Sequence, residues 1–149
     1  MESKQRFSLL SLVIAKEQKT SEFRQAWIDA LREDIALYYA RVSIVQAYLG
    51  IAESLNAAKL LEDNSGHYIE MNQASLRIKL RLNSTECDSQ AILEQMKSIE
   101  IRLNSDFADI RKTSSEISTA LRKLEADAPR LLKNEWKRGQ TRRTHISAC

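Results

Sequence analysis

The chain has 149 residues, of which 43% are hydrophobic and 29% charged, and its formal net charge is +3. These proportions exclude the weakly hydrophobic class of disordered proteins and also the integral membrane bundles. Three glycines and one proline are too few turn formers for a sheet of many strands, so we expect one all-α domain.

The first predicted element is the apolar run FSLLSLVIA at residues 7–15, which follows Lys4 and Arg6 and is followed at once by Lys16. As a helix it would be about 13 Å long, against roughly 30 Å of bilayer hydrocarbon, so it cannot span a membrane. No small-residue cleavage site follows it, as a secretory signal would require. Three interpretations stay open: a segment lying on a membrane, the remainder of a spanning segment, or a helical turn packed against the protein, which we favour.

A long amphipathic helix is predicted to begin at Thr20 or Ser21, whose hydroxyls can cap its first amides. Its apolar residues recur at steps of three and four, which is the period of a helix and not of a strand. They are Phe23, Trp27, Leu31, Ile35, Tyr38, Val42, Val45 and Leu49. The turn formers Asp-Asn-Ser-Gly at residues 63–66 are expected to end it, and Gly50 is a position where it can bend.

Residues 35–52 contain a single charged side chain, that of Arg41. The run approaches membrane length, but Ser43, Gln46 and three tyrosines interrupt it. We therefore predict a buried bundle helix and not a transmembrane one.

The segment from Leu76 to Leu82 alternates apolar and basic residues, which taken alone is typical of a half-buried strand. A single strand would have no partner in this chain, and the apolar residues also form two pairs spaced four apart, as on a helix. We predict a helix here.

A third helix is predicted from Thr85 to Ala128, after the cap residues Asn83 and Ser84. It carries a heptad rhythm of apolar residues over five repeats. Its d-type positions are Met96, Leu103, Ile110, Ile117, Leu124 and Leu131.

The flanks of this heptad pattern favour the wall of a bundle over a two-stranded zipper. Ile99 and Ala120 widen the apolar stripe, and the flanking charges do not alternate in the complementary way of a zipper. Pro129 is expected to stop or kink the helix, or to begin a short helix over residues 129–138.

The predicted fold is thus an elongated antiparallel helical bundle, coiled-coil-like, with two long helices and shorter ones. We divide the chain into a short apolar segment at residues 1–15, a helical bundle domain at residues 16–139 and a basic flexible tail at residues 140–149.

No catalytic or metal-binding motif stands out. Neither His67 nor His145 has the Glu three residues earlier that di-metal carboxylate bundles use, and the spacing of His145 and Cys149 lacks the further ligands of a zinc site. Nothing beside Cys87 marks an activated nucleophile. Because Cys87 and Cys149 could pair only across a long loop, we expect free thiols and a reducing compartment, the cytoplasm. We predict no enzyme activity, no metal and no cofactor.

Positive charge is concentrated at the C-terminal end, where residues 130–149 carry a net charge of +5, which leaves −2 for the rest. The residues of this basic tail are Arg130, Lys133, Trp136, Lys137, Arg138, Arg142 and Arg143. Basic side chains around an exposed tryptophan can neutralise the phosphates of nucleic acid or of acidic lipids. The alternatives are therefore nucleic acid, a membrane surface, or a solvated tail that contacts protein.

Three blocks of the sequence resemble an uncharacterised family of bacterial and prophage-associated helical proteins. The blocks are KEQKTSEFRQAWIDALRED at residues 16–34, RLNSTECDSQ at 81–90 and LLKNEWKR at 131–138. In that family a transmembrane helix typically precedes the first block, whereas FSLLSLVIA is shorter than such an anchor, and a proline commonly stands where Ser84 is here. The resemblance implies a cytoplasmic helical module at or near the inner membrane, with the first block's Lys16, Lys19 and Arg24 on the inside. It implies no activity.

Together these observations predict a non-enzymatic helical protein–protein interaction module, peripheral to the inner membrane and of phage or mobile-element origin. The partner would be another protein or a second copy of the chain. The contact residues expected are Phe23, Arg24, Trp27 and Leu31, because aromatic residues and arginine dominate interface energetics. The alternative is nucleic-acid binding through the basic tail.

Overall fold

The computed structural model describes residues 2–140, which form five helices and no strand. The helices are α1 (Glu2–Ile51), α2 (Ala57–Asp63), α3 (Ser65–Arg81), α4 (Cys87–Leu103) and α5 (Ile110–Gln140). The prediction of an all-α fold is confirmed for these residues. The helix predicted over residues 76–82 is confirmed up to Arg81, where α3 ends.

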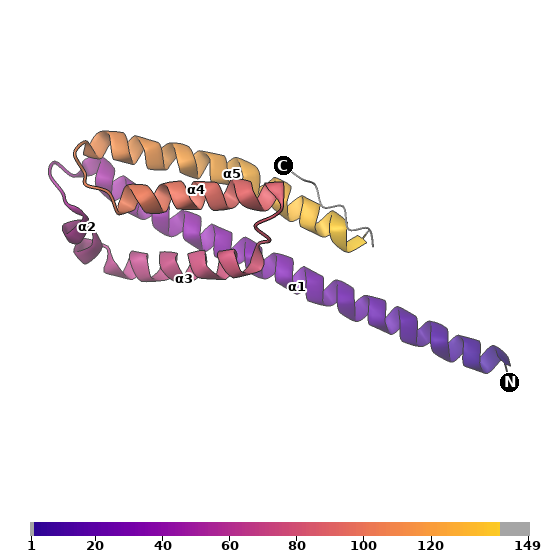
Figure 1. Cartoon of the computed structure of the whole chain (residues 1–149). Coiled ribbons are helices and arrows are strands. Elements are labelled where there is room, and N and C mark those ends of the chain that lie inside the picture. The colour runs from indigo at the N-terminus through magenta and orange to yellow at the C-terminus, as the bar shows by residue number, and fades with distance from the viewer. Residues whose placement is uncertain (1, 141–149) are drawn as a thin grey trace.

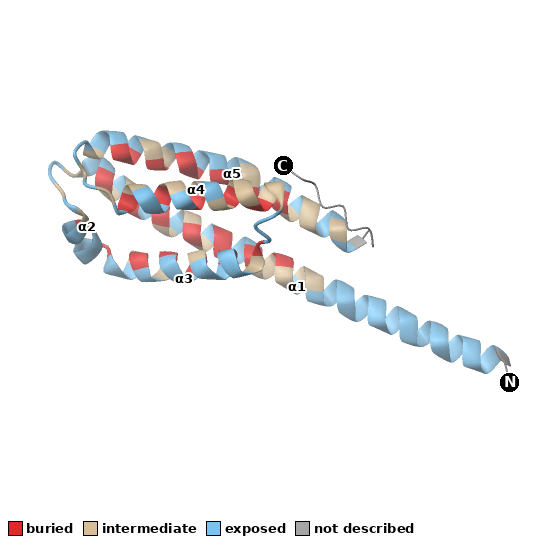
Figure 2. Ribbon diagram, viewed as in Figure 1, coloured by how far each residue is buried: buried red, intermediate tan, exposed pale blue. Residues whose placement is uncertain are grey.

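The helices assemble around α1, the longest of them (Figure 1). The C-terminal half of α1 packs against α3 and α5, α4 packs on α5, and the short α2 packs on α3. Helix α5 is antiparallel to α1, since Gln46 bonds Ser114 near one end of the pair and Arg24 bonds the carbonyl of Glu135 near the other. The N-terminal half of α1 extends beyond the bundle, where no other helix packs against it (Figure 1 and Figure 2).

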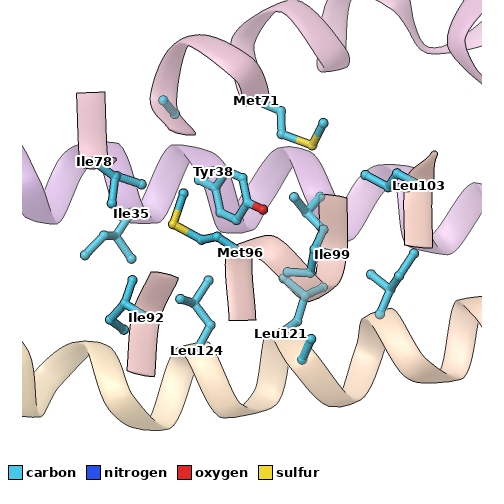
Figure 3. Close-up of a cluster of buried hydrophobic side chains, with 14 of the residues drawn as sticks. Ile35, Tyr38, Met71, Ile78, Ile92, Met96, Ile99, Leu103, Leu121 and Leu124 are labelled. Carbon is cyan, nitrogen blue, oxygen red and sulfur yellow. The ribbon is translucent and has the colours of Figure 1, made fainter. Parts of the chain in front are cut away.

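The core lies between α1, α3, α4 and α5 and consists mainly of aliphatic side chains, with methionines and Tyr38 among them (Figure 3). The core side chains of α1 follow the predicted helical period: Leu31, Ile35, Tyr38, Val42, Val45 and Leu49. A fully buried Leu, Ile or Val side chain contributes about 1.5–3 kcal/mol relative to an exposed one. This seam of α1 is therefore the main element that holds the other helices together.

A buried carboxylate joins α1 to α3. Asp34 is 7% exposed; its Oδ1 accepts a hydrogen bond from Arg77 Nε at 2.8 Å, and its Oδ2 pairs with Arg81. A buried charge is tolerated when it is paired in this way. The two arginines therefore fix how α3 lies on α1.

The alternating pattern at residues 76–82 comes from two apolar faces of α3. Ile78 and Leu82 are buried, whereas Leu76 and Leu80 are 58% and 77% exposed. The signal that resembles a strand thus belongs to a helix with apolar residues on its inner and its outer side.

The start predicted for the first long helix is wrong. Helix α1 begins at Glu2, well before the expected caps Thr20 and Ser21. The Thr20 hydroxyl donates a hydrogen bond to the carbonyl of Lys16 at 2.9 Å, which is the bond that a threonine makes inside a helix and not at its start.

The end predicted for this helix at residues 63–66 is also wrong. Helix α1 stops at Ile51, directly after Gly50, where the apolar period of its core residues ends. Asn56 then caps α2, because its side-chain oxygen accepts a hydrogen bond from the Lys59 amide at 2.8 Å. The turn formers at residues 63–66 separate α2 from α3 instead.

The single helix predicted over residues 85–128 is wrong, because a turn at residues 104–109 divides it into α4 and α5. Asn104 closes the last turn of α4, and the side chain of Asp109 caps the first turn of α5. The heptad pattern passes through this turn, since both helices present their apolar residues to the same core. Periodicity alone could not reveal the break.

Pro129 lies inside α5, which continues to Gln140. The helix end predicted at this proline, and a separate helix over residues 129–138, are therefore wrong. Pro129 removes the amide that would bond the carbonyl of Glu125. Both residues are exposed, so water can satisfy that carbonyl, and the buried Leu131 beyond it holds the helix to the core.

Cys87, at the start of α4, is disulfide-bonded. The free thiol expected at this position is wrong, and the inference of a reducing compartment loses the support that rested on it. The other cysteine of the chain, Cys149, lies outside the described residues, as do Arg142, Arg143 and nearly all of the predicted tail at residues 140–149.

Candidate interaction site on the projecting arm

The most unusual surface of the described chain is the part of α1 outside the bundle, which we call the arm and define as residues 3–23. Every one of these residues is exposed (Figure 2). The exposed side chains include six large hydrophobic ones from the run at residues 7–15, and Phe7 alone is 75% exposed. We predicted that this run would form a helical turn packed against the protein. The run is helical, but it does not pack against the bundle.

Within the arm, large apolar side chains cover two sides of the run at residues 7–15. At 100° per residue, Phe7, Leu10 and Ile14 lie on one side of the helix and the remaining large residues, Leu9, Leu12 and Val13, on the other. A helix segment that is apolar on most of its circumference is normally buried in a protein core or in lipid. Residues 7–15 thus have the surface of a buried segment in an exposed position.

The narrow strip between these sides is occupied by small residues and Lys4. Ser8, Ser11 and Ala15 share it, at spacings of three and four residues. The Ser11 hydroxyl donates a hydrogen bond to the carbonyl of Phe7 at 2.9 Å. Because this hydroxyl is satisfied within the helix, apolar surroundings would not leave it without a partner.

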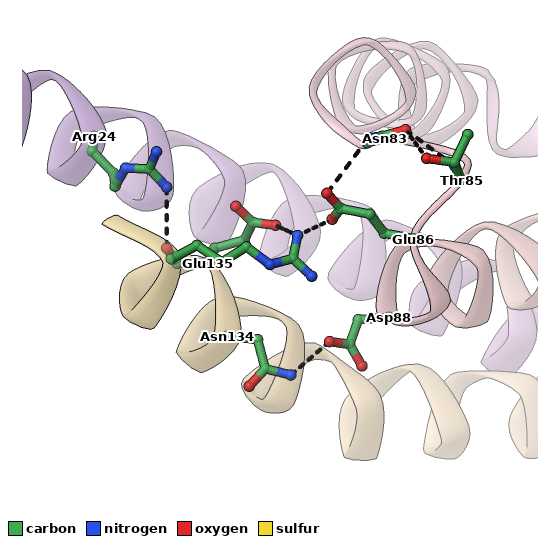
Figure 4. A network of polar contacts seen from close by, with 8 residues as sticks. Arg24, Asn83, Thr85, Glu86, Asp88, Asn134 and Glu135 are labelled. Atoms are coloured by element: carbon green, nitrogen blue, oxygen red, sulfur yellow. Dashed lines mark hydrogen bonds and ion pairs between the residues drawn. The ribbon is translucent and has the colours of Figure 1, made fainter. Parts of the chain in front are cut away.

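The arm meets the bundle at Arg24. Its Nη1 donates a hydrogen bond to the carbonyl of Glu135 at 3.3 Å (Figure 4). The Arg24 side chain lies across Gly139 of α5, where an added Cβ would overlap it. Glycine therefore permits the close approach between α5 and the base of the arm.

A polar cluster beside this contact fastens the start of α4 to the end of α5 (Figure 4). Arg138 pairs with Glu86 and, at 3.1 Å, with Glu135, and Asn134 donates a hydrogen bond to Asp88 at 2.6 Å. Burial raises the pKa of the Glu135 carboxyl, against the opposing effect of Arg138. These contacts hold the end of the bundle from which the arm projects.

The four predicted contact residues do not share one surface. Phe23 is exposed at the end of the arm, and Arg24 lies at its base. Trp27 is partly buried against the core, and Leu31 is fully buried within it. Phe23 is therefore accessible to a partner, Arg24 and Trp27 are partly accessible, and Leu31 is not.

Two of the predicted basic residues are engaged in ion pairs. Arg130 lies 2.6 Å from Asp127 and 3.6 Å from Asp88, and Arg138 is held in the cluster described above. Such pairing reduces the charge that these arginines could offer to phosphates. Nucleic-acid binding by the tail stays a prediction.

Lys133 and Trp136, also predicted in the basic tail, line a groove between α5 and α1. The groove has a volume of about 640 Å³ and includes Ile28 of α1 and Pro129. Lys137 has contacts within the protein. Arg130, Lys133 and Lys137 lie on one side of α5 at 100° per residue, whereas Arg138 lies apart from them in the polar cluster.

None of the helices in the described chain combines the length and apolarity that crossing a membrane needs. Within residues 2–140, no group of three or more histidine, cysteine, aspartate or glutamate side chains is placed to hold a metal ion. The disulfide of Cys87 also removes the thiol that a cysteine nucleophile would require.

Sequence reasoning missed the residues that fasten the base of the arm. Glu86, Asp88 and Gly139 were not among the predicted site residues. Their partners lie about fifty residues away in the chain, so no local pattern could pair them. Comparison of the chain with protein-family models, curated proteins and solved structures gives no significant match.

Proposed function

We propose that this protein is a non-enzymatic helical interaction module that attaches to a membrane surface through the arm and presents its bundle to partner proteins. The observation that carries the proposal is the apolar run at residues 7–15, exposed on a helix that leaves the bundle. The nine-residue run is about 13 Å long as a helix, which is too short to cross roughly 30 Å of bilayer hydrocarbon.

The apolar area of the arm supports a useful affinity for lipid. Six large side chains are about half to three-quarters exposed. At about 1.5–3 kcal/mol for a fully buried side chain, their transfer into lipid would yield on the order of 5 kcal/mol or more before the costs of binding. The same transfer would support the arm as a helix, since an isolated helix of this length is marginally stable in water.

Charges flank the apolar run on both sides, with Lys4 and Arg6 before it and Lys16 and Lys19 after it. Charged groups at both ends favour an arm that lies within the interface over one that points into the hydrocarbon. The long basic side chains can reach the headgroups from there.

The distribution of charge along the molecule favours the same orientation. Residues 2–24, at the arm end, carry five basic and three acidic side chains, whereas residues 51–66, at the opposite end, carry one basic and three acidic ones. An anionic surface would therefore attract the arm end and repel the opposite end.

Vesicle flotation with the full chain tests the proposal. We expect the protein to float with phosphatidylcholine vesicles that contain phosphatidylglycerol, and less with phosphatidylcholine alone. The double variant Leu9→Ser with Leu10→Ser should bind at least tenfold more weakly. The matched control is Leu76→Ser with Leu80→Ser, which removes two equally exposed leucines from α3 and should bind like the wild type.

Two results would contradict the proposal. One is a wild-type protein that stays with the soluble fraction for both vesicle compositions. The other is a control variant on α3 that loses as much binding as the arm variant, because the apolar surface responsible would then lie on the bundle.

A further inference from the structure

A cleft between α3 and α4 is used by none of the contacts described so far. Helix α3 packs on α1 and α4 packs on α5, with little direct packing between α3 and α4 themselves. The cleft between them has a volume of about 290 Å³, and α1 forms its floor with Tyr38. Its walls come from Met71 and Leu76 on one side and Ile99 and Leu103 on the other.

Tyr38 is the central feature of the cleft. Its side chain is 3% exposed, and its hydroxyl points into the space between Met71 and Ile99 (Figure 3). No hydrogen bond to this hydroxyl is found within residues 2–140, and the hydroxyl is not among the fully buried side-chain atoms that lack a partner. It is therefore open to the cleft, where ordered water or a ligand can bond it.

The tyrosine stays a neutral hydrogen-bonding group over the whole physiological range. Burial raises the pKa of Tyr38 above its ordinary value, and the nearby Glu100 carboxylate raises it further. The hydroxyl can therefore both donate and accept a hydrogen bond, but it offers no charge.

More polar groups surround the cleft on the α3 side. Tyr68, Asn72 and Ser75 line it there. Asn104 lines it on the α4 side, so the cleft combines apolar walls with at least as large a share of polar groups. A small-molecule site needs both, since apolar walls bind the body of the ligand and polar groups orient it.

The mouth of the cleft is crossed by an ion pair between α3 and α4. Lys79 Nζ lies 3.4 Å from Glu100 Oε2, and both side chains are about half exposed. An exposed pair of this kind contributes little to stability, so it can open without disturbing the bundle.

The size of the cleft limits its ligand. A cavity of roughly 150 Å³ accommodates benzene, so about 290 Å³ accommodates two fused rings. The thioether of Met71 at the wall would make a favourable contact with an aromatic ring. We propose that the α3–α4 cleft binds a small, uncharged aromatic or heteroaromatic molecule of about bicyclic size, with one polar group directed at the Tyr38 hydroxyl.

Indole and 1-methylindole are suitable probes, because they have nearly the same shape and only indole carries an N–H donor. Titration of the ¹⁵N-labelled full chain should shift the amide resonances of residues around the cleft. In Tyr38→Phe we expect indole to bind about three- to tenfold more weakly and 1-methylindole to bind unchanged. Without a probe bound, Tyr38→Phe should melt at the same temperature as the wild type or higher, because it loses an unpaired hydroxyl.

A second variant, Ser75→Trp, fills the cleft from its rim and should abolish the binding of both probes. Leu80→Trp, on the outer side of the same helix, is the matched control and should leave both affinities unchanged. The proposal is overturned if neither probe shifts cleft resonances at millimolar concentration, if Tyr38→Phe weakens both probes equally, or if Ser75→Trp leaves binding intact.

Discussion

Residues 3–23 and residues 28–49 belong to the same helix, yet the first are exposed at every position while the second supply the longest seam of the core. Both segments contain large apolar residues, so composition does not separate them. In the bundle, packing supports the helix. In the arm, only propensity and bonds within the helix support it, and these are weak for an isolated segment. The apolar run of the arm therefore has no packing partner among the described residues.

The largest expected effect comes from a variant in the core seam of α1, and not from one in the arm. Leu31→Ala should lower the free energy of unfolding by about 2–5 kcal/mol, because Leu31 is fully buried and its truncation leaves a cavity. Leu10→Ala on the arm should change it by no more than about 0.5 kcal/mol. Urea denaturation followed by circular dichroism measures both.

This pair of variants also checks whether the arm is free in solution. A loss of stability with Leu10→Ala comparable to that with Leu31→Ala would mean that the arm packs against the bundle or a second copy. The exposed arm would then be an incorrect description of the molecule in water.

The second effect concerns the contact between α1 and α3. Asp34→Ala should cost about 2 kcal/mol, because it leaves two arginines without their shared buried partner, although the partial exposure of both reduces the penalty. The matched control is Asp29→Ala, which removes an exposed aspartate paired with Arg32 inside α1 and should cost about 0.5 kcal/mol or less. Equal losses of unfolding free energy in Asp34→Ala and Asp29→Ala, measured by urea denaturation, would contradict a special role for Asp34.

The smallest effect concerns the base of the arm and depends on pH. Burial raises the pKa of Glu135 in the folded protein, so the native state binds this proton more tightly than the unfolded state. The contribution of Glu135 to stability is therefore fully present below its ordinary pKa of 4.5 and is lost as pH rises through the folded value. Glu135→Gln should raise the urea midpoint at pH 7, with the gain shrinking towards pH 4.

The exposed Glu94 of α4 provides a control for this effect, since Glu94→Gln should show no such dependence on pH. A Glu135→Gln variant less stable than the wild type at pH 7 would mean that the ion pair with Arg138 outweighs the cost of burial. In that case the cluster at the base of the arm gains stability from its charges.

The helical period located the core seam of α1 correctly, because one side of a helix must be apolar wherever it is buried. The same signal could not locate the turn at residues 104–109. Helices α4 and α5 face one core, so their apolar positions continue through the turn as if the helix were unbroken. Asn104 and Asp109 were visible in the sequence, but polar residues are equally common on the outer side of a long helix.

The site was harder to predict than the fold. Leu31 was assigned to a contact surface because sequence cannot distinguish an apolar residue in the core from one that meets a partner. The exposed arm was missed for the opposite reason, since an apolar run is expected to be covered by its own chain. The polar cluster at Glu86 and Arg138 depends on contacts between distant segments, which one sequence without relatives does not contain.

The continuity of α1 sets a distance. From Ala15 at the end of the apolar run to Tyr38 in the floor of the cleft, the helix rises about 35 Å without a break. If the arm is anchored as proposed, the cleft keeps a nearly constant distance from the anchor, measured along α1. Any tilt of the arm would then move the whole bundle with it.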